Sequence, residues 1–208
     1  MAAHRSHFHF VSALVVALSL SVGAAAAQER LTPPARPPGP PKQLVRPKVR
    51  TDLDKLFDLL RRAPDKQSGK LIEARIWSEW FHTGSDTAML LMVRVNVAME
   101  ADDNDTALQL LDAVVKIMPD YVEGWDRRAT LHFLRKDYGA ALYDLSQTLA
   151  REPRHFGAMV ALGMILQEIG QEKRALAAFR QALALNPYLD RVPDLIKQLA
   201  PKVDGRDI

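Results

Sequence analysis

The sequence predicts an all-α repeat solenoid of antiparallel helix pairs, with a further helix covering its C-terminal end. The first observation is a fixed spacing, since Pro119, Pro153 and Pro187 stand 34 residues apart. The second is that residues of the same types recur at the same offsets before each proline. A period of this length is typical of stacked helical repeats, in which each unit buries its apolar face against its neighbours.

Residues 1–27 have the pattern of a cleaved secretory signal. Arg5 precedes an apolar run over residues 8–22, and alanines at 25 to 27 form a cleavage motif before Gln28. The alternative is a membrane anchor, but about 20 apolar residues are needed to span a bilayer and this run is shorter. We therefore expect a periplasmic protein with no transmembrane segment after cleavage. The chain contains no cysteine, so lipid attachment is not expected.

Residues 28–51 are expected to form a disordered, basic linker. Proline occupies seven of the 17 positions from 31 to 47, which removes helical donors and favours an extended chain. Residues 28–50 carry a net charge of +5, although the whole chain carries only +3. The body that follows is therefore mildly acidic, which argues against nucleic-acid binding. The linker itself is expected to contact anionic envelope polymers only weakly, because salt screens such contacts.

Residues 52–85 are expected to form a degenerate N-terminal helix pair. Apolar residues at 53, 56, 57 and 60 have helical spacing, and Pro64 ends this first helix. A second helix is expected over residues 70–82. In the 34-residue register, Ser85 stands where proline is expected and Glu73 stands where the later units have alanine. Terminal repeats are usually atypical, so this pair is expected to cap the array.

Residues 86–189 are expected to form three regular units, at about 88–121, 122–155 and 156–189. Each unit should contain a helix A, a short polar turn and a helix B that ends before the unit's proline. Residues 102–105, 136–139 and 170–171 are the expected turns. Residues 190–208 should hold a capping helix over 191–199, stopped by Pro201, and a C-terminal tail.

Small and large apolar residues recur at fixed positions within the units. Small residues are expected where helices A and B approach closely, because a larger side chain there would overpack the pair by roughly 1–3 kcal/mol. Large residues are expected to fill the spaces between units. The residues that define the repeat in this way are Trp125, Gly163, Ala107, Ala141, Ala175, Phe179, Pro119, Pro153 and Pro187.

This spacing resembles the tetratricopeptide repeat, whose pattern is W-x2-L-G-x2-Y, then A-x3-F, then P. The stretch REPRHFGAMVALGMILQEIGQEKRALAAFRQALALNPYLD carries the resemblance most clearly. The chain is similar to small exported tetratricopeptide proteins of alphaproteobacteria. The resemblance implies a tetratricopeptide-repeat solenoid that acts as a periplasmic scaffold or adaptor, serving envelope maintenance or the assembly of envelope complexes.

The sequence predicts no catalytic residue, no metal site and no cofactor, and hence no enzyme. His82, His132 and His155 are far apart in the sequence and none has a second histidine at i+4, and without cysteine the familiar zinc spacings are missing. The acidic cluster at 102–105 lacks the glycine and glutamate of a calcium loop. Nucleophile elbows, Gly-rich phosphate loops and dinucleotide fingerprints are also missing from the sequence.

The resemblance further implies that the A helices line a concave groove that binds a protein or peptide. Carboxylate clamping is not expected, because Met92 stands where a lysine is needed, and Gly157 and Ala161 replace basic residues. The remaining groove positions form a methionine-rich apolar strip, and methionines adapt to varied apolar surfaces. If the groove-facing positions are assigned one residue too early or too late, some of these methionines are core residues instead. The expected groove residues are Met89, Met92, Asn96, Met99, Asp126, Arg127, Thr130, Phe133, Val160, Met164 and Gln167.

A second function stays open at this point. The basic, proline-rich arm is also consistent with a tether to the cell wall or a membrane surface. Deletion of the arm would then abolish pelleting with the envelope at low salt.

Overall fold

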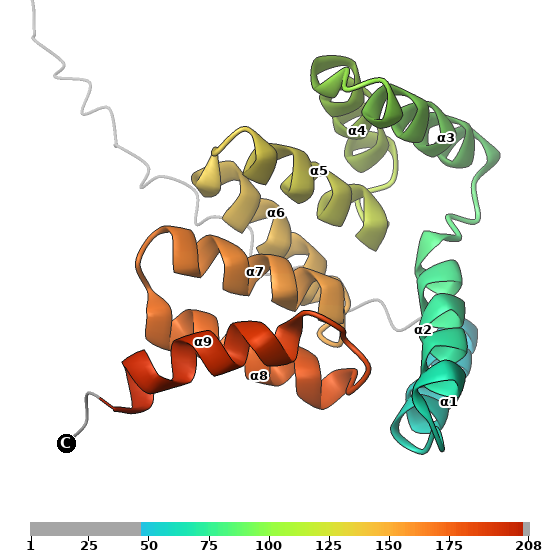
Figure 1. Cartoon of the computed structure of the whole chain (residues 1–208). Helices are drawn as coiled ribbons and strands as arrows, with labels where there is room; N and C mark the ends of the chain where they lie inside the picture. Colours follow the sequence, from blue (N-terminus) through green and yellow to red (C-terminus); the bar gives the residue numbers. More distant parts are fainter. Residues whose placement is uncertain (1–46, 206–208) are drawn as a thin grey trace, which may run out of the picture. The chain divides into compact units, whose positions relative to one another are not determined.

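The computed structural model describes residues 47–205, with side chains from residue 52, and every regular element in this range is a helix. Figure 1 shows these helices in chain order, arranged as successive antiparallel pairs. The predicted all-α repeat fold is confirmed. The expected signal (1–27), most of the expected linker (28–46) and the end of the tail (206–208) lie outside the described residues.

The N-terminal pair consists of α1 (Pro47–Arg61) and α2 (Lys66–Phe81). Helix α1 begins within the expected linker, whose boundary at residue 51 is therefore corrected to 46. A proline suits the first position of a helix, where its missing N–H has no helical partner in any case. Helix α2 also begins earlier than expected, because Asp65 caps it by accepting the backbone N–H of Ser68 at 2.8 Å.

Three further helix pairs follow, and each helix B ends two residues before its proline. The A-to-B turns place Asp102, Lys136 and Gly170 in the left-handed region, with φ of 55°, 59° and 76°. The first two pairs cap helix B with the next residue, Asp103 or Asp137. The six helices are α3 (Asp86–Glu100), α4 (Asn104–Ile117), α5 (Val122–Leu134), α6 (Tyr138–Arg151), α7 (Phe156–Glu168) and α8 (Glu172–Leu185).

Helix α9 (Val192–Asp204) covers α8 and runs past the expected stop at Pro201. A proline inside a helix costs a hydrogen bond, but contacts beyond it favour continuing the helix. Val203 packs against the buried cluster that contains Phe179 of α8. Asp204 also accepts a hydrogen bond from Arg180 at 2.7 Å. These contacts explain why the capping helix is longer than predicted.

The N-terminal pair does not cap the array as expected. Trp80 of α2 instead packs in one buried cluster with Phe57 of α1 and Phe156 of α7. The hydroxyl of Tyr188, which follows α8, donates to the backbone oxygen of Ala63 at 2.7 Å. Helices α1 and α2 are thus anchored mainly on the second and third units. Phe81 at the end of α2 packs against the buried cluster of the first unit, but Leu90 and Val97 on the upstream face of α3 stay exposed.

Side-chain size explains this departure. In the 34-residue register, Trp80 stands where Val114 and Thr148 occur in later units. Glu73 likewise stands where helix B elsewhere has a buried alanine. Bulky or charged residues at these two positions prevent α2 from stacking closely as an ordinary helix B.

The helices of the described region are too short or too polar to be candidates for crossing a bilayer.

Candidate functional site

The predicted groove residues lie on one side of α3, α5 and α7, which we call the A-helix surface. Figure 1 shows these three helices following one another through the array. Thr130 and Met164 are exposed. Met92 is fully buried. The other predicted residues are partly buried, and they are Met89, Asn96, Met99, Asp126, Arg127, Phe133, Val160 and Gln167.

Met92 is the clearest departure from the expected groove. Its side chain packs in the buried cluster that also contains Tyr121 and Leu131. This position faces the seam between α3 and α5, so the methionine fills a space between units. Met92 is therefore a core residue that a partner cannot reach in this structure.

Helix α2 covers the N-terminal ends of α5 and α7. Trp80 stacks on His155, with ring centroids 4.2 Å apart. Trp77 leaves no room for a side chain at Gly157, where an added Cβ would lie 2.6 Å from the indole. At the same edge, the hydroxyl of Tyr121 donates to the backbone oxygen of Phe81 at 2.8 Å. The chain thus occupies part of its own A-helix surface.

A buried polar cluster lies beneath α2. Glu123 and Asp126 share one face of α5, and His155 precedes α7. His155 is fully buried, and its Nε2 lies 3.0 Å from an oxygen of Glu123. Its Nδ1 lies 3.9 Å from Asp126. Burial raises the pKa of Asp126 to about 6, against the opposing effects of His155 and Arg127.

Glu123, Asp126 and His155 offer three ligand atoms within 4.8 Å of one another, which invites a metal interpretation. The hydrogen bonds of the imidazole oppose it. Nδ1 accepts the backbone N–H of Ala158 at 2.9 Å, which assigns the ring proton to Nε2, and Nε2–H donates to Glu123. A metal on Nε2 would move the proton to Nδ1 and break the cap of α7. The three residues are better explained as a hydrogen-bond network that joins two units.

Arg127 is held within the protein. Its guanidinium donates to the side-chain oxygen of Asn96 at 2.8 Å and lies 3.7 Å from an oxygen of Glu123. It also stacks over the ring of Phe81, 5.2 Å from the ring centroid. Asn96 and Arg127 therefore bridge α3 and α5, whereas the sequence alone placed both as groove residues.

The C-terminal part of the A-helix surface is open. Leu134 at the end of α5 is 59% exposed, and Met164 on α7 is also exposed. Thr130 lies one turn before Leu134, and its hydroxyl donates to the backbone oxygen of Asp126. Phe133 lies half-buried beside Tyr138, with ring centroids 6.1 Å apart. Leu134, Met164, Thr130 and Phe133 form what we call the open strip.

The repeat-defining residues lie at close helix contacts. Ala107, Ala141 and Ala175 are fully buried, and an added Cβ on Gly163 would lie 2.5 Å from the ring of Phe179. Trp125 donates its indole N–H to the backbone oxygen of Pro119 at 2.8 Å, which ties α5 to the turn before it. These residues hold the units together and leave the binding surface to other positions.

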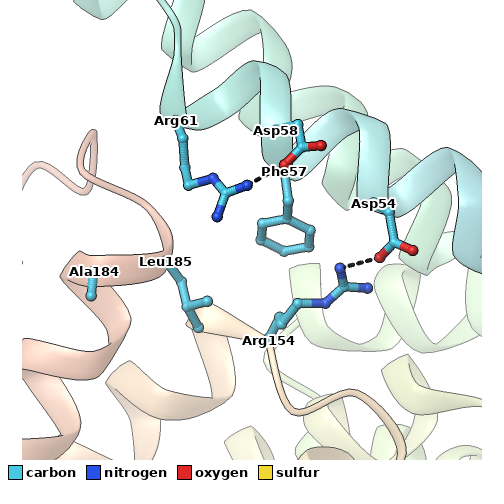
Figure 2. Close-up of a pocket in the computed structure, with 7 residues that line it drawn as sticks. All are labelled: Asp54, Phe57, Asp58, Arg61, Arg154, Ala184 and Leu185. Atoms are coloured by element: carbon cyan, nitrogen blue, oxygen red, sulfur yellow. Dashed lines mark hydrogen bonds and ion pairs between the residues drawn. The ribbon is translucent and has the colours of Figure 1, made fainter.

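A separate pocket of about 300 Å³ lies between α1 and α8. Figure 2 shows Phe57 at its centre, with the guanidinium of Arg154 beside it. Arg154 pairs with Asp54, and Arg61 pairs with Asp58. Because both cations already have carboxylate partners, the pocket offers a ligand little unpaired charge. We interpret this pocket as part of the packing interface between the N-terminal helix pair and the array.

The fold and its open strip define a helical-repeat scaffold of the protein-interaction class. The chain is 37% identical over 153 residues to a TPR repeat-containing protein of Rhizobium etli, which covers 74% of this chain and 75% of that protein. The chain therefore belongs to the tetratricopeptide repeat (TPR) proteins, and its expected resemblance to an alphaproteobacterial member is confirmed. No family model matches the chain.

Solved structures agree on the fold. The first TPR domain of Spaghetti (RPAP3), bound to an HSP90 peptide, aligns with a TM-score of 0.53 at 16% identity, covering 55% of this chain and 91% of that one. The MamA protein aligns with a TM-score of 0.53 at 16% identity, covering 76% and 83%. At such low identity these structures support the TPR architecture alone.

Sequence reasoning missed the residues that join α2 to the array. Nothing in the sequence indicates that His155 caps α7 and stacks on Trp80. One signal is present in the sequence, since Trp77 and Trp80 are one helical turn apart on the second helix of the N-terminal pair. The periodicity showed that they are buried but not against which unit.

Proposed function

We propose that this TPR protein is a periplasmic, non-lipidated scaffold that binds a peptide segment of another protein along its open strip, without catalysis. The exposure of Met164, a predicted groove residue of α7, and of Leu134 on the neighbouring helix α5 carries the proposal. Apolar side chains in such a row suit an apolar helix or extended segment. The RPAP3 domain bound to an HSP90 peptide shows that this architecture binds a peptide in another protein.

The open strip also limits the chemistry of the partner. The Arg127 guanidinium is engaged with Asn96 and Phe81, so a partner carboxylate would have to displace those contacts. The open strip beyond α2 is apolar apart from the hydroxyl of Thr130. An apolar segment therefore fits better than an acidic one, as expected from the missing carboxylate clamp.

Export and an envelope role belong to the same proposal and rest on the pattern of residues 1–27. The tether function rests on the basic arm, which lies almost entirely outside the described residues, and no structural contact favours it. A fusion of the chain to a reporter that is active only outside the cytosol tests export. Activity that requires residues 1–27 supports export, and activity without them contradicts it.

Affinity purification from the native cells tests partner binding. The full chain is compared with a variant carrying Leu134→Asp and Met164→Asp, and with the control Tyr143→Asp. Tyr143 is 58% exposed on α6, away from the A-helix surface. We expect one protein to co-purify with the wild type and the control and to be lost from the double variant. Equal recovery with all three forms would contradict the proposal.

A further inference from the structure

The upstream face of α3 is an uncovered repeat-stacking surface. Leu90 and Val97 on this face are 62% and 61% exposed. The equivalent residues one unit later, Gly124 and Leu131, are buried. An added Cβ on Gly124 would lie 2.9 Å from Val114 of the preceding helix B. The same position on α3 has no preceding helix B against it.

The equivalent residues of the third unit repeat the comparison. Ala158 and Ile165 of α7 are both buried, at 0% and 1% exposure. Only in the first unit of the three do these two positions face solvent. The apolar character of Leu90 and Val97 therefore matches a surface made for stacking, in a unit that the N-terminal pair leaves uncapped.

Two charges on this face are unpaired and symmetrically placed. Asp86 and Arg94 lie four residues before and after Leu90, so all three share one face of α3. Within residues 52–205, neither Asp86 nor Arg94 has an ion-pair partner. A second α3 placed antiparallel about Leu90 would bring each arginine opposite an aspartate.

We propose that the upstream face of α3 binds a second copy of this chain. The two α3 helices pair antiparallel across a two-fold axis at Leu90. Leu90 packs against the partner's Leu90, and Arg94 pairs with the partner's Asp86. Such an isologous contact closes on itself and gives a dimer.

The other end of the array disfavours head-to-tail assembly. Helix α9 covers it, and the outward residues Asp194, Lys197 and Gln198 are polar and exposed. This polar surface therefore lacks the apolar side chains that a preceding helix B would place against α3. A copy of α3 itself offers both the apolar side chains and the complementary charges.

The dimer face is distinct from the A-helix surface. Successive residues of a helix are about 100° apart, which places Asn96 roughly a third of a turn around α3 from Leu90. Dimerisation therefore leaves the open strip on α5 and α7 accessible. Loss of the dimer and loss of partner binding can consequently be observed separately.

Charge exchange tests the pairing in the full chain by sedimentation velocity over a range of concentrations. Arg94→Asp alone and Asp86→Arg alone each place like charges at both contacts, so we expect each to weaken dimerisation at least about tenfold. Mixing the two variants restores both opposite-charge contacts and should restore a dimer. A monomeric wild type, or equal dimerisation by every form, would overturn the proposal. Circular dichroism verifies that each variant is folded.

A cysteine crosslink tests the axis independently, since the chain has no other thiol. Leu90→Cys treated with a short bis-maleimide in living cells should give a covalent dimer of the full chain. The control Leu134→Cys is equally exposed but lies on the open strip, and should give no dimer. Crosslinking of Leu90→Cys to a different protein alone, or no crosslink at all, would overturn the proposal.

Discussion

Trp80 of α2 stacks on the imidazole of His155, with ring centroids 4.2 Å apart and planes 19° from parallel. The same imidazole caps α7 through Ala158 and donates to Glu123 of α5. One aromatic contact therefore joins the N-terminal pair to two units of the array. This explains how α1 and α2 stay attached without stacking on α3.

Truncation of Trp80 should release the N-terminal pair. We expect Trp80→Ala to lower the free energy of unfolding by about 3–5 kcal/mol, as for other buried aromatic side chains. Urea denaturation followed by circular dichroism measures the loss. The control Leu71→Ala removes a side chain of the same helix that is 69% exposed, and should change stability by less than about 0.5 kcal/mol. Similar losses in both variants would contradict the anchoring role of Trp80.

The buried cluster should make stability depend on pH. The pKa of Asp126 rises from its ordinary value of 3.8 to about 6 because the carboxyl is buried. The folded chain therefore binds this proton more tightly than the unfolded chain, and Asp126 lowers stability as the pH rises from about 4 to 6. Asp126→Asn should remove this loss and gain on the order of 1–3 kcal/mol relative to wild type between these pH values.

Urea denaturation at several pH values measures this difference. The control Asp120→Asn changes an exposed carboxyl in the turn after α4, and its stability profile should stay parallel to that of the wild type. A parallel profile for Asp126→Asn as well would show that the Asp126 carboxyl does not titrate as expected.

Arg128 should be far more important to stability than Arg135. Arg128 donates two hydrogen bonds of 2.8 Å to Asp144, which is buried. Arg128→Ala leaves that carboxylate buried with only His132 near it, whose Nε2 lies 3.8 Å away, and we expect a loss of about 3–5 kcal/mol. Arg135 pairs with the exposed Asp105, so Arg135→Ala should cost no more than about 1 kcal/mol. Chemical denaturation of both variants checks the order, and equal losses would refute it.

Close helix packing predicts opposite outcomes at two glycines. Gly163→Ala forces a methyl group against the Phe179 ring and should destabilise the chain by about 1–3 kcal/mol. Gly139→Ala lies in α6, where the nearest atom to an added Cβ is 3.7 Å away. This control should be neutral or stabilising, because alanine favours helix over glycine. Thermal unfolding compares the two, and a stable Gly163→Ala variant would disprove the close contact.

The local structure was largely predictable because it depends on neighbours in sequence. The 34-residue spacing of Pro119, Pro153 and Pro187 marked the end of each helix B, and the small residues marked close packing. The continuation of α9 past Pro201 was not predictable from proline propensity, since the contacts of Val203 with α8 outweigh it. Helix propensity depends only on the residues of the segment itself, whereas its packing depends on the residues of other segments that contact it.

The candidate site was harder to predict than the fold. Met92 occupies the same repeat position as Asp126 and Val160, which are only partly buried, yet it is fully buried because it packs in the cluster with Tyr121 and Leu131. The docking of α2 over His155 depends on contacts between residues 75 positions apart in the chain. Periodicity within each helix carries no information about such contacts, so the sequence predicts Asp126 and Arg127 as groove residues, although both contact other residues of the protein.

Photocrosslinking from Leu134 in living cells tests the central claim, that the open strip holds a partner. A photoreactive amino acid replaces Leu134 in one strain and Tyr143 in the other, since both side chains are almost equally exposed. We predict a discrete adduct with one protein from position 134, weakened by Met164→Asp, and no such adduct from position 143. The same adducts from both positions, or none from position 134, would contradict the account.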